Sequence, residues 1–68
     1  MKQIKQEKLF NIYLDFIFEE NEEIVSAYLD EDKETLEVNY IDTQDETCNV
    51  YIASLDEERL KKYQQYTK

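Results

Sequence analysis

Three carboxylates alternate along a short acidic segment of the chain: Asp30, Asp32 and Glu34. This spacing matches the first three ligands of a calcium loop of the EF-hand type. The rest of that pattern is missing, because Thr35 stands where the loop needs glycine and Ile41 where it needs a bidentate glutamate. The segment therefore predicts loose attraction of cations, and we expect no bound metal and no cofactor.

Nucleophilic and acid–base chemistry have few residues to work with, because the chain has no His, no Gly and a single Cys. It therefore lacks an imidazole base, a His metal ligand and a glycine-rich phosphate loop. Cys48 is expected to face Tyr40 in the core, with no base nearby to ionise its thiol. Paired carboxylates acting as acid and base are the one enzymatic alternative. We expect a protein that is not an enzyme.

Negative charge is concentrated in the middle of the chain. Sixteen of the 17 acidic residues lie between Leu9 and Glu58, where Lys33 is the only base, and the net charge is -9. Such a field repels nucleic acid and anionic membranes and attracts basic surfaces. We therefore expect a basic protein partner, with no direct binding of nucleic acid and no membrane association.

Length and composition favour one small folded domain over residues 1–68. The chain is 41% hydrophobic with nine aromatic residues, which argues against disorder despite 37% charged residues. A chain of this size buries only about 60% of its unfolded surface, so a second subunit would help its core. One Cys cannot form an internal disulfide, and no apolar run approaches the roughly 18 residues of a membrane span. The expected location is the cytoplasm.

A helix is predicted from Lys2 to about Glu20, where good helix formers carry a wide apolar arc. The arc spans about 240°, more than one core needs. Either the helix lies between a sheet and a second helix, or its extra face forms a dimer or partner interface. The residues of the arc are Phe10, Tyr13, Leu14 and Ile17, widened by Leu9, Ile12 and Phe16.

Three segments with alternating apolar residues, 24–29, 36–41 and 47–53, are separated by acidic connections of hairpin length. Pairing Leu29 with Glu34, and Ile41 with Thr47, gathers apolar residues on one face. This predicts a three-stranded antiparallel meander with 36–41 at its centre. The opposite face would carry Ile24, Ser26, Tyr28, Glu37, Asn39, Tyr51 and Ala53.

A second helix is predicted to open at Ser54, whose hydroxyl would cap it while Glu57 reaches back. Leu55, Leu60 and Tyr63 would form its apolar face. The expected fold is a small two-layer α+β domain in α-β-β-β-α order, with both helices on the apolar face of the meander.

The hairpin turns of a meander lie at opposite ends of the sheet, so the acids divide into two groups. Spaced carboxylates can stand in for phosphates on a basic protein. The alternative is that acidic turns keep a small domain soluble and protect its sheet edges. The candidate partner-binding residues are Asp30, Glu31, Asp32 and Glu34 in one turn, Asp42, Asp45 and Glu46 in the other, and Tyr28 and Tyr51 on the open sheet face.

In size, charge and element order the chain resembles the small acidic inhibitors that phages make against DNA-handling host proteins, including some anti-CRISPR and anti-restriction DNA mimics. The resemblance covers composition and architecture. It implies an inhibitor or modulator of a nucleic-acid-binding protein. The abundance of Lys, Ile, Asn, Tyr, Phe and Glu, with two Ala and no Gly, is typical of an AT-rich coding sequence and separately indicates a low-GC bacterial or phage source. The alternative is a homodimeric structural or regulatory protein, joined through the first helix, whose acidity serves solubility.

Overall fold

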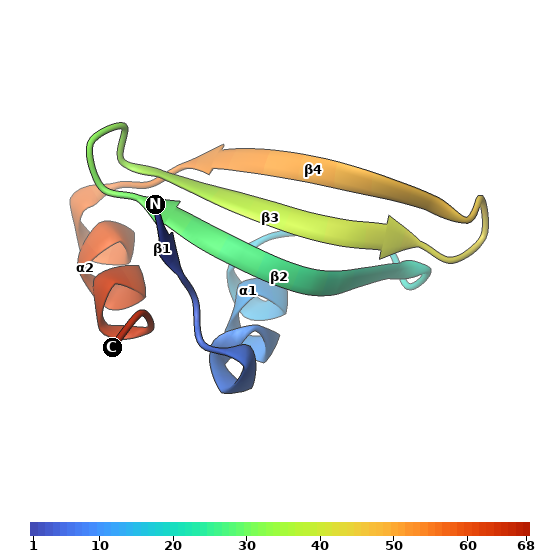
Figure 1. Ribbon diagram of the computed structural model, residues 1–68, viewed down its shortest axis with the longest axis horizontal. Helices are drawn as coiled ribbons and strands as arrows, with labels where there is room; N and C mark the ends of the chain where they lie inside the picture. The colour runs from blue at the N-terminus through green and yellow to red at the C-terminus, as the bar shows by residue number, and fades with distance from the viewer.

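The computed structural model describes residues 1–68 as a four-stranded antiparallel sheet with two helices on one face (Figure 1). This agrees with the predicted α+β class and helix layer, but the sheet has four strands instead of three. The spatial strand order is β1-β2-β3-β4. Along the chain, the elements are β1 (Lys2–Gln3), a 3-10 turn η1 (Gln6–Lys8), α1 (Phe10–Asp15), β2 (Glu22–Asp30), β3 (Thr35–Asp42), β4 (Thr47–Ser54) and α2 (Glu57–Gln65).

The predicted long first helix is wrong, because only Phe10–Asp15 is α-helical. The chain before it joins the sheet, where Lys2 lies opposite Leu29 and the Ile4 N–H donates to the Ala27 carbonyl at 2.8 Å. Ile4 is then 1% exposed. Helix propensity is a weak preference, and pairing with the edge of β2 while burying an isoleucine outweighs it.

The first helix also presents the opposite face to the core from the predicted stripe. Leu9 and Ile12 are buried, whereas Phe10, Leu14 and Ile17 are 68%, 71% and 97% exposed. The helix ends at Asp15, and the extended segment after it carries Phe16 and Phe18 under the sheet. The residues that face the core are therefore those predicted only to widen the apolar stripe, and not the stripe itself.

In the pairing of β2 with β3, most side chains lie on the face of the sheet on which they were predicted. Leu29 lies opposite Leu36 and Ala27 opposite Val38, a shift of two residues that preserves the side-chain alternation. A bulge between Ile24 and Ser26 then reverses the alternation. As a result Ile24, expected on the open face, packs against the core.

The pairing of β3 with β4 differs from prediction by one residue. Ile41 lies opposite Cys48, where Thr47 was expected. Because side chains alternate with a period of two, this shift turns the whole of β4 over. Tyr51 and Ala53 now share the helix-covered face with Val38 and Leu36, while Cys48, Val50 and Ile52 lie on the open face.

The second helix begins two residues later than predicted, with Glu57 as its first residue. Ser54 belongs to β4, paired with Thr35, and Asp56 is the N-cap instead. Its carboxylate accepts the Arg59 N–H at 2.8 Å, which satisfies a backbone donor of the first turn. No helix of the chain has the length and apolarity needed to cross a membrane.

The core lies between the sheet and the helices. It is formed by Ile4, Leu9, Ile12, Ala27, Leu29, Leu36, Val38, Leu55 and Tyr63.

Candidate functional site

The first acidic turn, between β2 and β3, is held by one of its own carboxylates. Asp30 Oδ1 accepts the backbone N–H groups of Asp32 and Lys33, both at 3.1 Å. Glu34 closes the turn in the left-handed region at φ 55°. Asp30 therefore maintains the backbone of the turn.

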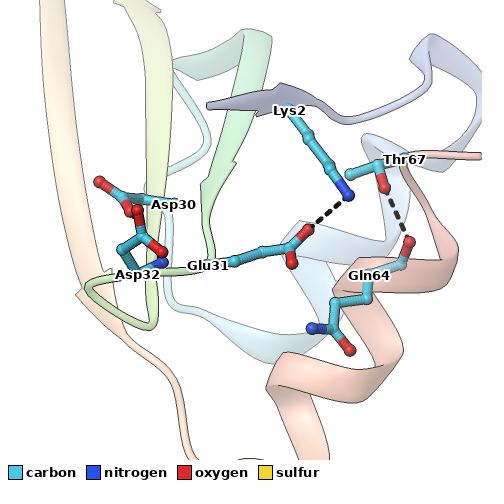
Figure 2. Close-up of polar contacts among 6 residues, drawn as sticks. All are labelled: Lys2, Asp30, Glu31, Asp32, Gln64 and Thr67. Carbon is cyan, nitrogen blue, oxygen red and sulfur yellow. Dashed lines mark hydrogen bonds and ion pairs between the residues drawn. The ribbon is translucent and has the colours of Figure 1, made fainter.

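The carboxylates of this turn point to two different sides of it (Figure 2). Glu31 extends toward β1 and forms an ion pair with Lys2 at 2.8 Å, whereas Asp30 and Asp32 lie on the other side of the turn. Both members of the pair are substantially exposed, so it contributes at most about 1 kcal/mol. To the right of this pair in Figure 2, the Thr67 hydroxyl donates to the Gln64 carbonyl at 2.7 Å and closes the end of α2.

The second acidic turn, between β3 and β4, repeats this geometry. Asp42 Oδ1 accepts the N–H groups of Gln44 at 3.0 Å and Asp45 at 3.2 Å, and Glu46 adopts φ 57°. The Asn21 side chain adds a third donor at 2.7 Å. These hydrogen bonds, from the Asp45 amide first and then from Asn21, hold the pKa of Asp42 below its usual value.

The two turns lie at opposite ends of the sheet, along a molecule of 34 × 22 × 18 Å (Figure 1). At the first turn, the Leu55 N–H donates to the Glu34 carbonyl at 2.9 Å, which brings the acidic start of α2 alongside. At the second, the Thr43 N–H donates to the Asn21 carbonyl at 2.8 Å, which brings the acidic 19–23 segment alongside. Each end of the long axis therefore gathers carboxylates from two segments distant in sequence.

The two candidate tyrosines lie on opposite faces of the sheet. Tyr28 is opposite Glu37 on the open face, as predicted. Tyr51 was predicted there too, but the shifted register of β4 puts it on the helix-covered face. Its ring centroid lies 6.0 Å from that of Phe16 and 5.9 Å from that of Phe18, in edge-on geometry. The predicted tyrosine patch does not exist.

Aliphatic side chains occupy the open face of β4 instead. Val50 and Ile52 are 58% and 61% exposed, and Ile41 on β3 is 36% exposed. Cys48 is also exposed opposite Ile41, which corrects its predicted core position facing Tyr40. Nowhere in the structure do three His, Cys, Asp or Glu side chains converge as metal ligands would.

A cluster that sequence reasoning missed joins the two helices. The buried Tyr63 hydroxyl donates to Asp15 Oδ2 at 2.6 Å, and Lys62 Nζ pairs with the same oxygen at 2.5 Å. Burial and the neighbouring Asp15 carboxylate raise the pKa of Tyr63 far above its usual value. Burial alone would raise the pKa of Asp15, but hydrogen bonds from Lys62 and Tyr63 outweigh it and leave that pKa lowered.

One sequence signal for this cluster exists. Asp15 is the only charged residue between Leu9 and Phe18, and a carboxylate within an apolar run needs a partner when the run is buried. The cluster connects α1 to α2 and is structural.

Comparison of the chain with protein-family profiles, with curated protein sequences and with solved structures finds no match.

Proposed function

We propose that this protein is a non-enzymatic acidic binding protein that docks on a basic, nucleic-acid-binding protein and inhibits or modulates it. One observation carries the proposal. Carboxylates from separate segments gather at both ends of a 34 Å axis, and each end contains a turn held by its own hydrogen bonds. The cytoplasm is the compartment in which such a target would be met.

The turns divide their acids between two tasks. Asp30 and Asp42 hold the backbone, which leaves the carboxylates of Asp32, Asp45 and Glu46 outside the turn hydrogen bonds. A backbone that is already ordered loses little entropy on docking. Carboxylates presented in this way can accept charge-assisted hydrogen bonds from Arg and Lys and steer a basic partner by long-range attraction.

Charge reversal at each end tests the proposal. The variants are Asp32→Lys with Glu34→Lys for the first turn, and Asp45→Lys with Glu46→Lys for the second. Both leave Asp30 and Asp42 in place, so the turns keep their hydrogen bonds. A matched control, Glu7→Lys with Glu37→Lys, changes the net charge equally at positions outside the two ends.

The measurement is capture from bacterial lysate at low salt, elution by a salt gradient and mass spectrometry of the retained proteins. We expect the wild type and the control to hold one basic nucleic-acid-binding protein, and each turn variant to hold it at least about tenfold less tightly. Circular dichroism verifies the folds. Undiminished capture by both turn variants would rule out docking through the acidic ends.

A second candidate function is a homodimeric structural or regulatory module, and the outer face of α1 favours it. Phe10, Leu14 and Ile17 lie within one short segment and are all highly exposed. Such a patch is typical of a protein interface. If a second copy covers it, light scattering will give a dimer for the wild type, a monomer for Leu14→Lys, and a dimer for the control Val50→Lys on the open sheet face.

A further inference from the structure

The sheet has two edges, and only one of them is protected. At one edge, the two-residue β1 covers β2 at Leu29 and Tyr28, and a bulge interrupts β2 near Val25. The β4 edge has no neighbouring strand. Its eight residues include no proline, no bulge and no charged side chain, although 37% of the chain is charged. Proteins use those devices to prevent an edge from pairing with another chain.

The backbone of β4 has hydrogen-bonding groups available for such pairing. The Leu55 N–H donates to the Glu34 carbonyl, which continues the β3–β4 ladder beyond β4. Backbone groups of an antiparallel strand point alternately to its two neighbours. The amides of Cys48, Val50 and Ile52 therefore face away from β3, toward the open edge. The exposed Val50 and Ile52 side chains add an aliphatic strip beside them.

Charge decides which strand fits this edge. β4 is preceded by Asp45 and Glu46 and followed by Asp56, Glu57 and Glu58. If two copies paired antiparallel through β4, the acids after one strand would approach the acids before the other, and like charges so placed repel. A strand with Lys or Arg at both ends would instead meet opposite charge at both ends.

We propose that β4 receives an extended segment of the partner protein as a fifth strand of the sheet. The segment has an uncharged middle with aliphatic residues on alternate positions, and basic residues on both sides. Backbone hydrogen bonds along the edge would provide affinity, while the acidic ends select the basic strand and reject a second copy. The inference rests on the proposed function and names the contact through which docking occurs.

A synthetic peptide with two lysines on each side of a Thr-Val-Thr-Val-Thr-Val segment tests this contact. A second peptide has the same sequence but is N-methylated throughout that segment, which keeps the charges and side chains and removes the backbone donors. Titration calorimetry at low ionic strength measures both. We expect the unmodified peptide to bind and N-methylation to weaken it at least about tenfold, because several hydrogen bonds are lost together.

Two protein variants locate the site. Val50→Pro removes a backbone N–H that faces outward from the edge strand, a position where proline is tolerated. Val50→Thr keeps that backbone N–H and has a side chain of similar shape. We expect Val50→Pro to lose the unmodified peptide and Val50→Thr to retain it within about threefold. The N-methylated peptide keeps the test decisive if Val50→Pro does not fold.

Other outcomes would overturn strand addition in distinguishable ways. Equal binding of both peptides would show docking by charge alone, which leaves the proposed function standing without this contact. Binding of neither peptide would exclude the edge, while capture by the acidic turns is judged separately by the charge reversals. A wild-type dimer that Val50→Pro dissociates would make a second copy the occupant.

Discussion

Single residues show that the acids of this chain do different work. Asp30 and Asp42 hold turns, Asp56 caps α2, and Asp15 joins two helices. These carboxylates are engaged within the fold, and Glu31 is partly engaged through Lys2. The remaining acids at the two ends of the sheet are available to a partner, so charge reversals should avoid the structural positions.

Asp15 gives a pH-dependent prediction. Its pKa is lowered in the folded protein, so between the folded and unfolded pKa values the unfolded chain binds more protons, and stability rises with pH. The contribution of Asp15 is complete above its unfolded pKa of about 4 and is lost as pH falls through the lower folded value. Asp15→Asn should therefore cost about 1–3 kcal/mol at pH 7, and the cost should shrink in acid.

Urea unfolding of the wild type and Asp15→Asn across acidic to neutral pH measures this difference. Tyr63→Phe is the companion variant, because it removes the buried hydroxyl that donates to Asp15 while keeping the ring. Its expected cost is about 1–2 kcal/mol at neutral pH. A difference between wild type and Asp15→Asn that does not change with pH would contradict the role of the Asp15 charge.

At the scale of elements, an extended segment follows α1 where the sequence predicted that the helix would continue, and its aromatic side chains pack against the sheet. Phe16 and Phe18 reach under the sheet, where the ring centroids of Phe18 and Tyr40 are 5.4 Å apart and those of Phe16 and Tyr63 are 6.4 Å apart. Arg59 also lies 5.2 Å from the centre of the Phe16 ring. This aromatic cluster joins β3, β4 and α2 to the end of α1.

Neighbouring alanine substitutions test that arrangement. Phe18→Ala should destabilise the protein by about 2–4 kcal/mol, because it removes a ring that packs on Tyr13, Tyr40 and Tyr51. Ile17→Ala should change stability by less than about 0.5 kcal/mol, since that side chain is 97% exposed. Thermal or urea unfolding measures both. A larger loss for Ile17 than for Phe18 would mean that the segment packs through its other side.

For the whole molecule, the dominant quantity is the net charge of -9. It is spread over both ends of a small elongated domain, so the folded state repels itself. The same charge opposes self-association through the unprotected β4 edge. Solubility and selection of a basic partner thus have one physical origin.

Opposite responses to salt follow. Raising ionic strength screens the repulsion within the fold, so the unfolding midpoint should rise, by a few degrees for a domain of this size. The same salt should weaken capture of the basic partner. Differential scanning fluorimetry and the elution gradient measure the two effects. A midpoint that is insensitive to salt would mean that the carboxylates are too far apart, or too well solvated, to repel.

Local sequence patterns determined much of this protein. Alternating apolar residues and acidic connections of hairpin length predicted β2, β3 and β4 as a meander, and they correctly predicted acids at both ends of the sheet. These features are set by residues close together in the sequence, because side-chain alternation in a strand and the residue preferences of a turn each involve only a few positions.

Tertiary structure decided the features for which the local sequence fits two alternatives equally well. In β4 both faces carry apolar residues, so the left-handed turn at Glu46 set the register and moved Tyr51 to the core side. In α1 the apolar arc is wide enough for either side to face inward, and contact with the sheet selected Leu9 and Ile12. The pairing of β1 with β2 and of Asp15 with Tyr63 joins residues far apart in sequence. Such contacts depend on which surfaces meet when the chain closes, which periodicity along the chain does not encode.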